Sequence, residues 1–176
     1  MINIIACIQV SLQSKRLPGK ALLPLAGIPS ILHLIRRLKK SDFVGDKIVM
    51  CCSDLDIDDE LEKIGLDEDI YIIRGHKLNV ASRFLAAIDM FEKDLGSGKV
   101  DYMVRCTGDD VILDFKILDE IITEMILGMK GYKFNYLNLK NAIKGTDFEI
   151  INSNYLRKVY DKLSENERLK TEYLSK

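Results

Sequence analysis

Short apolar runs alternate along the chain with longer segments in which apolar residues recur at every third or fourth position. A continuous run such as Asn3 to Val10 predicts a strand buried on both faces, whereas the spacing of Ile31, Leu34 and Leu38 predicts one apolar helix face. We expect strands at residues 3–10, 47–52, 70–74, 102–106, 133–137 and 148–151, and helices at residues 30–40, 57–64, 80–95, 115–129 and 154–163. This alternation is typical of an α/β protein with a mostly parallel sheet.

The length of 176 residues fits a single domain over residues 1–176, since periodic apolar segments continue on both sides of the loop at residues 96–98. The net charge of -1 offers no basic excess for the phosphates of a nucleic acid, which argues against that partner. The first apolar run lacks a basic leader and ends at Gln9, so it predicts a strand and not a signal peptide. No apolar run approaches the roughly 20 residues of a membrane span.

Four cysteines, at positions 7, 51, 52 and 106, lie inside apolar runs without metal-ligand spacing or a neighbouring histidine. Free cysteine is among the most buried residue types, so we expect reduced core residues. Reduced cysteines in turn predict a cytoplasmic location.

The most informative loop, Gln9 to Lys20, follows the first strand and has the sequence QVSLQSKRLPGK. In open α/β sheets, ligands bind in the crevice outside the carboxyl ends of the strands. There Arg16 can offer a planar fork to two phosphate oxygens, while Lys20 acts as a mobile point charge. The loop is not a Walker A motif. A solvated basic loop is the alternative, because Pro18-Gly19 is also an ordinary turn signal.

This loop resembles the Gln-Ala-Arg-x-x-Ser-x-Arg-Leu-Pro-Gly-Lys segment of the cytidylyltransferases. That family includes the spore-coat polysaccharide biosynthesis protein F group and, more distantly, the synthetases for CMP-activated ketodeoxyoctonate and sialic acids. Gln9, Ser14 and residues 16–20 match in register. Three later segments are similar to family segments as well: RGHKLNVASRF at 74–84, VRCTGD at 104–109 and GTDFEI at 145–150.

The resemblance implies a three-layer αβα, Rossmann-like nucleotide-diphospho-sugar transferase fold. It also implies an enzyme that transfers CMP from CTP to a sugar acid, for surface polysaccharide or glycan synthesis, with release of pyrophosphate. We expect catalytic roles for Arg16, Lys20 and Asp109, nucleotide contacts from Gln9, Ser11, Ser14, Arg16, Lys20, Arg74, Arg83 and Thr107, and Mg²⁺ on Asp109 and Asp147.

The reaction itself favours two carboxylates, because attack on a triphosphate concentrates negative charge that a divalent cation offsets. Magnesium binds through one or two carboxylates plus substrate phosphates, so Asp109 and Asp147 are sufficient protein ligands. The alternative for both aspartates is helix capping or turn formation, since the sequence only implies that they are close together.

Two departures from the family pattern bear on activity. Ser11 stands where the family carries arginine, so one cationic contact is lost unless Lys15 compensates. The C-terminal segment at 167–173 resembles a family motif, but the chain stops soon afterwards and is short relative to the family. In the family the longer tail completes part of the sugar side of the cleft, so a homodimer that supplies this wall is an alternative.

Two other functions remain open. A nucleotide-binding or regulatory relative would keep the fold without turnover. A glycosyltransferase on a similar fold would use Asp54 and Asp56, which form a D-x-D pattern in an acidic stretch.

Overall fold

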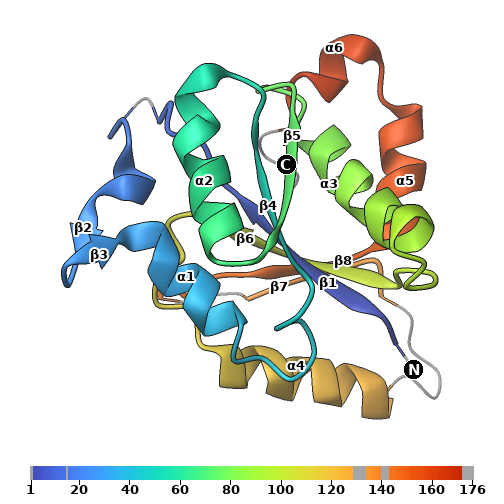
Figure 1. Ribbon diagram of the computed structural model, residues 1–176. Helices are drawn as coiled ribbons and strands as arrows, with labels where there is room; N and C mark the ends of the chain where they lie inside the picture. Colours follow the sequence, from blue (N-terminus) through green and yellow to red (C-terminus); the bar gives the residue numbers. More distant parts are fainter. Residues whose placement is uncertain (1, 15, 129–133, 140–142, 172–176) are drawn as a thin grey trace.

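The protein is built on a sheet in which most strands are parallel (Figure 1). The structure, a computed structural model, describes residues 2–14, 16–128, 134–139 and 143–171. Within them, six strands form the main sheet in the order β5 (Tyr71–Gly75), β4 (Ile48–Ser53), β1 (Ile4–Gln9), β6 (Tyr102–Thr107), β8 (Glu149–Asn152) and β7 (Tyr136–Asn138). Strands β5, β4, β1 and β6 run parallel, and β8 is antiparallel to both of its neighbours.

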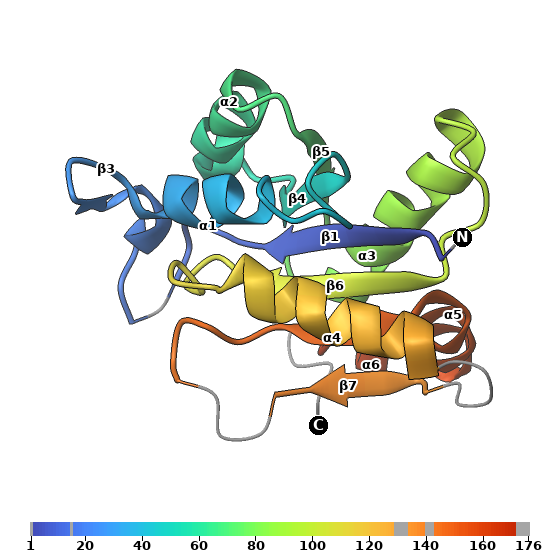
Figure 2. The ribbon, with the colours of Figure 1, turned by 90° about the horizontal axis from the view of Figure 1, so that it is seen from below.

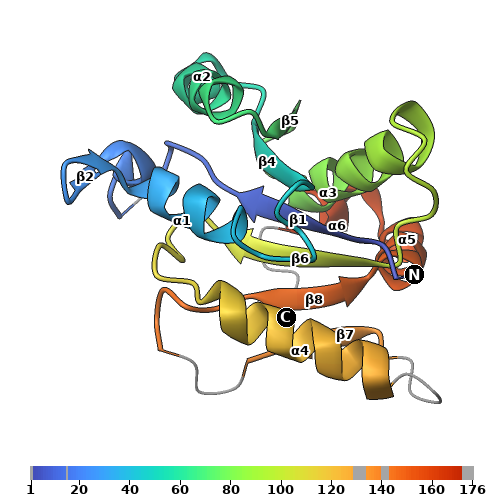
Figure 3. The same cartoon turned by 60° about the horizontal axis from the view of Figure 1, so that its bottom comes forward.

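Helices cover both faces of the sheet and give three layers, as the sequence predicts (Figures 2 and 3). Helices α1 (Ser30–Leu38) and α4 (Phe115–Gly128) lie on one face, and α3 (Val80–Asp89) and α5 (Ser153–Lys162) lie on the other. Helix α2 (Asp59–Asp67) packs beside β4 and β5. The α/β prediction and the three-layer arrangement are therefore confirmed.

The two layers of core follow from the period-two alternation of strand side chains. In β1, Ile4, Ala6 and Ile8 pack with the apolar faces of α1 and α4, while Ile5 and Cys7 pack with those of α3 and α5. Every residue of β1 up to Ile8 is buried, which explains why its sequence is continuously apolar.

The cysteines behave as predicted: all four are free and buried. Burial raises the pKa of Cys7 and Cys106 well above the ordinary thiol value, and it raises the pKa of Cys52 to about 12. These thiols stay protonated and pack as small apolar side chains.

Several elements differ from the expected pattern. The helix expected at 80–95 is α3 followed by a π-helical turn, Met90–Asp94. The strand expected at 148–151 pairs antiparallel as β8, a direction that its apolar pattern does not indicate. The first residue of the strand expected at 133–137, and the last residue of the helix expected at 115–129, lie outside the described residues.

A small hairpin and two short helices were not expected from the sequence. The hairpin pairs β2 (Pro24–Leu25) with β3 (Ile28–Pro29) and projects from the body of the protein (Figure 1). Its two central residues, Ala26 and Gly27, both have positive φ, which a tight two-residue turn requires. The short helices are η1 (Lys20–Leu22) and α6 (Glu165–Arg168), whereas η2 (Asp56–Asp58) overlaps the helix expected at 57–64, which continues as α2. None of these elements is long enough to show a periodic apolar pattern.

Among the helices in the described ranges, none combines the length and the apolarity needed to cross a membrane.

Helix α2 offers a matched test of the core. Leu61 is wholly buried, whereas Leu66 on the same helix is 67% exposed. We expect Leu61→Ala to lower the free energy of unfolding by about 3 kcal/mol, because it leaves a cavity. Leu66→Ala should change it by less than about 0.5 kcal/mol. Urea unfolding of both variants checks this, and equal losses would contradict the described packing.

Candidate active site

The site lies where the strand order reverses. The chain passes from β1 to β4 on one side and later returns to place β6 on the other side, so the loops after β1 and β6 leave the same edge of the sheet. Such a switch point opens a crevice at the carboxyl ends of parallel strands. Here Lys20 Nζ lies 2.7 Å from Asp109 Oδ2, and both side chains are partly exposed. The structure thus brings together two residues predicted from sequence for catalysis.

Asp109 is held by a second predicted residue, Thr107, whose hydroxyl lies 2.7 Å from Asp109 Oδ1. Partial burial raises the pKa of Asp109, but the hydrogen bonds from Lys20 and Thr107 and the charge of Lys20 outweigh it, so the net shift is downward. Asp109 is therefore ionised at neutral pH and can attract a cation.

Asp147 reaches the same edge from the loop before β8. Its loop is tied to the one after β6, because Ile112 N donates to Gly145 O at 3.0 Å. A cavity of about 150 Å³ lies between them and is lined by Arg105, Thr107, Asp110, Asp147, Phe148 and Glu149. Three carboxylates against one guanidinium leave this cavity with an excess of negative charge.

The excess negative charge fits a divalent cation. No group of three or more His, Cys, Asp or Glu side chains within the described residues could hold a metal ion by itself. Magnesium does not need such a group, since one or two carboxylates suffice when substrate phosphates complete its shell.

Asp110, which sequence reasoning did not assign to the site, is buried beside Asp109. Burial raises the pKa of Asp110 to about 6; hydrogen bonds from Thr107 oppose this rise, and the charges of Asp109 and Asp147 add to it. The family resemblance gave no signal here, because the similar segment at 104–109 ends one residue before Asp110.

A second network that sequence reasoning missed is centred on Arg105. Its Nε donates to Gln9 Oε1 at 3.0 Å, and its Nη1 lies 2.6 Å from Glu149 Oε2. The Tyr136 hydroxyl donates to Glu149 Oε1 at 2.7 Å, and burial and this bond raise the pKa of Tyr136 to about 12. Gln9, a predicted nucleotide contact, is thus held at the strand ends. An arginine inside an apolar strand was the available signal, because a buried charge requires partners.

The loop after β1 is closed by its own backbone. Gly19 N donates to Leu12 O at 2.8 Å, and Gly19 has φ 68°, a conformation that favours glycine. Ser14 Oγ accepts from Leu17 N at 3.4 Å. Arg16 is exposed and makes no hydrogen bond or ion pair with any described residue, whereas Lys15 lies outside the described part of the chain.

Ser11, where the family carries arginine, faces another carboxylate. Its hydroxyl donates to Asp58 Oδ1 at 3.4 Å and accepts from Gln13 N at 3.2 Å. The side chain therefore braces the loop internally and brings no positive charge to it.

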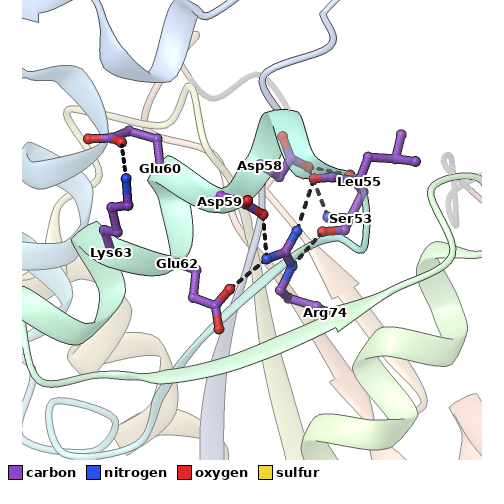
Figure 4. Close-up of polar contacts among 8 residues, drawn as sticks. All are labelled: Ser53, Leu55, Asp58, Asp59, Glu60, Glu62, Lys63 and Arg74. Atoms are coloured by element: carbon purple, nitrogen blue, oxygen red, sulfur yellow. Dashed lines mark hydrogen bonds and ion pairs between the residues drawn. The ribbon is translucent and has the colours of Figure 1, made fainter.

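The other two predicted arginines, Arg74 and Arg83, lie at the edge made by β4, β5 and α3. Arg74 forms ion pairs with Asp59 and Glu62, at 2.7 and 2.5 Å, and donates to the carbonyls of Ser53 and Leu55 (Figure 4). These contacts hold its guanidinium toward α2 and not toward the pair formed by Lys20 and Asp109.

Arg83, on α3, is only 3% exposed and donates to Cys51 O at 3.1 Å. Burial lowers its pKa, and nearby negative charges, among them those of Asp58 and Asp54, oppose the shift. The nucleotide contacts assigned to Arg74 and Arg83 stay predictions.

Comparison with known families gives one decisive match. The cytidylyltransferase family model aligns with residues 5–173. The chain belongs to the cytidylyltransferase family.

Two curated relatives are similar to this chain over most of its length. The spore coat polysaccharide biosynthesis protein SpsF of Bacillus subtilis is 31% identical over 159 residues, covering 89% of this chain and 62% of that protein. A 3-deoxy-manno-octulosonate cytidylyltransferase of Trichlorobacter lovleyi is 28% identical over 142 residues, covering 81% of this chain and 51% of that protein. This cytidylyltransferase-family chain thus spans about half to three-fifths of their lengths.

Solved structures agree with the family fold. A cytidylyltransferase from Leptospira borgpetersenii superposes with a TM-score of 0.83 at 26% identity, covering 97% of this chain and 68% of that one. A CMP:2-keto-3-deoxy-manno-octonic acid synthetase complexed with CTP superposes with a TM-score of 0.64 at 12% identity, covering 98% and 83%. The second likeness concerns the fold alone.

The raised pKa of Asp110 makes the stability of this cytidylyltransferase-family chain depend on pH. The folded state holds this proton more tightly than the unfolded state does, so the contribution of Asp110 to stability falls as pH rises from about 4 to about 6. The full loss from this group is about 3 kcal/mol, because the pKa rises from 3.8 to about 6. Asp110→Asn should remove this pH dependence.

Urea unfolding at pH values from 4 to 8, in the presence of a chelator, measures the effect. The exposed Asp46→Asn is the control, and its free energy of unfolding should change with pH as that of the wild type does. If the free energy of unfolding of Asp110→Asn changed with pH as in the wild type, burial would not raise the pKa of Asp110.

Proposed function

We propose that the protein is a nucleotidyltransferase that transfers the cytidylyl group of CTP to a hydroxyl of a sugar acid. The acceptor hydroxyl oxygen forms a bond to the α-phosphorus and loses its proton to water, the bond from that phosphorus to the bridging oxygen breaks, and pyrophosphate leaves. The observation that carries this proposal is the pair of Lys20 and Asp109 at the switch point, 2.7 Å apart. It joins an anion-binding and a cation-binding group at one place, as transfer from a metal-bound triphosphate requires.

Lys20 and Arg16 bind the phosphates. Lys20 is 29% exposed and sits at the start of η1, so its base is fixed by the backbone while its ammonium group lies against Asp109. Arg16 is exposed and can offer its planar fork to two oxygens. Because negative charge accumulates on the bridging oxygen as pyrophosphate leaves, both cations stabilise the leaving group more than the ground state.

Asp109 and Asp147 would hold Mg²⁺. When bound, this ion offsets negative charge on the phosphates and orients them for in-line attack. Thr107 steadies the Asp109 carboxylate through the 2.7 Å contact between them. The excess of carboxylates around the neighbouring cavity supports a cation in this position.

The choice of cytosine and of a sugar acid rests on the relatives. One similar protein is named for spore coat polysaccharide biosynthesis, and another for cytidylyl transfer to 3-deoxy-manno-octulosonate. Gln9 is held beside the crevice by Arg105 and is the group we assign to a contact near the base.

A nucleotide-binding relative with weak turnover is the second candidate, and Ser11 favours it. Its hydroxyl is bonded to Asp58, so position 11 supplies no charge to the phosphates. A protein of this kind would bind CTP and release little pyrophosphate.

Substituting the central pair tests the proposed reaction. Lys20→Ala and Asp109→Asn should each lower the rate of pyrophosphate release from CTP and Mg²⁺, across a panel of sugar acids, by about 100-fold or more. The wild type should release pyrophosphate only when an acceptor is present. Calorimetry with CTP and Mg²⁺ on the same samples separates binding from turnover.

Lys63 provides the control, because it forms an exposed ion pair with Glu60 at 3.3 Å on α2, away from the switch point. Lys63→Ala should retain the wild-type rate. Binding of CTP without pyrophosphate release for every acceptor would support the second candidate. Binding of a nucleotide sugar that depends on Asp56 but not on Asp109 would favour a glycosyltransferase instead.

Restoring the family arginine is a separate prediction. Ser11→Arg should tighten CTP binding about tenfold, because a charge-assisted contact to phosphate replaces a hydroxyl. Ser97→Arg, in the loop that follows the π-helical turn, is the matched control and should leave affinity unchanged. Unchanged or weaker binding in Ser11→Arg would mean that position 11 does not face the phosphates.

A further inference from the structure

Asp58 is a buried carboxylate that the proposed reaction does not use. It has no exposed surface and ends η2, immediately before α2. Aspartate at this place commonly caps the following helix, yet its side chain makes no such bond to α2 among the described residues. Its hydrogen bonds go to two other segments.

One carboxylate oxygen faces the end of β4 and the other faces the loop after β1. Oδ2 accepts from Ser53 N at 2.9 Å and also from the Ser53 hydroxyl. Oδ1 accepts from Leu12 N at 2.8 Å and from the Ser11 hydroxyl at 3.4 Å. Asp58 therefore joins the end of β4 to the start of the phosphate-binding loop.

Leu12 carries this restraint across the loop. Its N–H is bonded to Asp58, and its carbonyl accepts from Gly19 N at 2.8 Å. Gly19 is the residue before Lys20, whose ammonium group reaches Asp109. A continuous path of hydrogen bonds and one peptide link thus runs from Asp58 to the base of the Lys20 side chain.

Packing alone does not explain why a charged residue is buried at position 58. A buried carboxylate loses its hydration, and near a phosphate-binding loop its charge opposes the ligand. Four hydrogen bonds, and the buried cation Arg83 nearby, offset that loss. Removing the acceptor would leave the Leu12 N–H buried without a partner, and the loop would rearrange to satisfy it.

We propose that Asp58 is a positioning residue for the nucleotide: it fixes Leu12, and through the bond from Gly19 to Leu12 it sets the point from which Lys20 extends. The proposal rests on the proposed function, since it takes the triphosphate of CTP as the ligand of the loop. Asp58 itself does not contact the ligand.

Asp58→Asn tests the proposal with two readouts. The amide group puts a donor where the carboxylate has only acceptors, so one of its two sides must lose its bond. We expect hydrogen exchange at the Leu12 and Gly19 amides to accelerate, and the Kd for CTP with Mg²⁺ to rise, by about tenfold or more in each case. Both are measured well below the melting temperature of the variant.

Two controls separate positioning from stability. Ser53→Ala removes a bond to the same carboxylate on the side of β4 and leaves the loop side intact, so it should change both readouts by less than about threefold. Asp67→Asn alters an exposed carboxylate at the end of α2 and should change neither. If Asp58→Asn does not fold, Asp58→Glu replaces it, because it keeps both acceptors and displaces them by one methylene group.

The outcomes distinguish this proposal from the proposed function. If the wild type binds no CTP, the proposed function fails, and amide exchange at Leu12 and Gly19 alone decides the role of Asp58. CTP affinity within twofold of wild type in a folded Asp58 variant with a loosened Leu12 amide overturns positioning. So does a loss of affinity in Ser53→Ala that matches the loss in Asp58→Asn.

Discussion

Burial on both faces of β1 is the constraint on which the rest of the structure depends. Side chains of this strand alternate between two apolar layers, so no polar group can be placed along its length without a buried partner. Chemistry is therefore confined to the strand end, where Gln9 leaves the core. The parallel neighbour β6 obeys the same rule up to Thr107, apart from Arg105, which has Glu149 as its partner. The active-site loops lie where this constraint is released.

Much of the fold could be predicted because its signals are local and repetitive. Continuous apolar runs marked β1, β4 and β6, and three-and-four spacing marked α1 and α3. The antiparallel direction of β8 could not be predicted, since a buried strand has the same composition in either direction. The hairpin of β2 and β3 is too short to show alternation and depends on the positive φ of Ala26 and Gly27.

In the candidate site, too, some residues could be predicted from the sequence and others could not. The loop sequence and the VRCTGD strand end indicated Lys20 and Asp109, and the structure places them 2.7 Å apart. Asp58 could not be found in this way, because it lies in an acidic stretch that is typical of an exposed helix N-terminus, where no single carboxylate stands out. Burial alone sets it apart from Asp56 and Asp59, and burial there depends on how η2 turns toward the core. The direction of Arg74 toward α2 likewise depends on tertiary packing.

The pair of Lys20 and Asp109 also makes the site select between a single ion and an anion and cation that bind together. An anion that approaches Lys20 competes with Asp109, and a cation that approaches Asp109 competes with Lys20. Either one arriving alone must break the pair and leave one charge without its partner. When both arrive, each occupies the group that the other releases, so their affinities are linked and each strengthens the other by the same factor. In the proposed reaction, free phosphate or a stray metal ion would thereby be disfavoured relative to a metal-bound triphosphate.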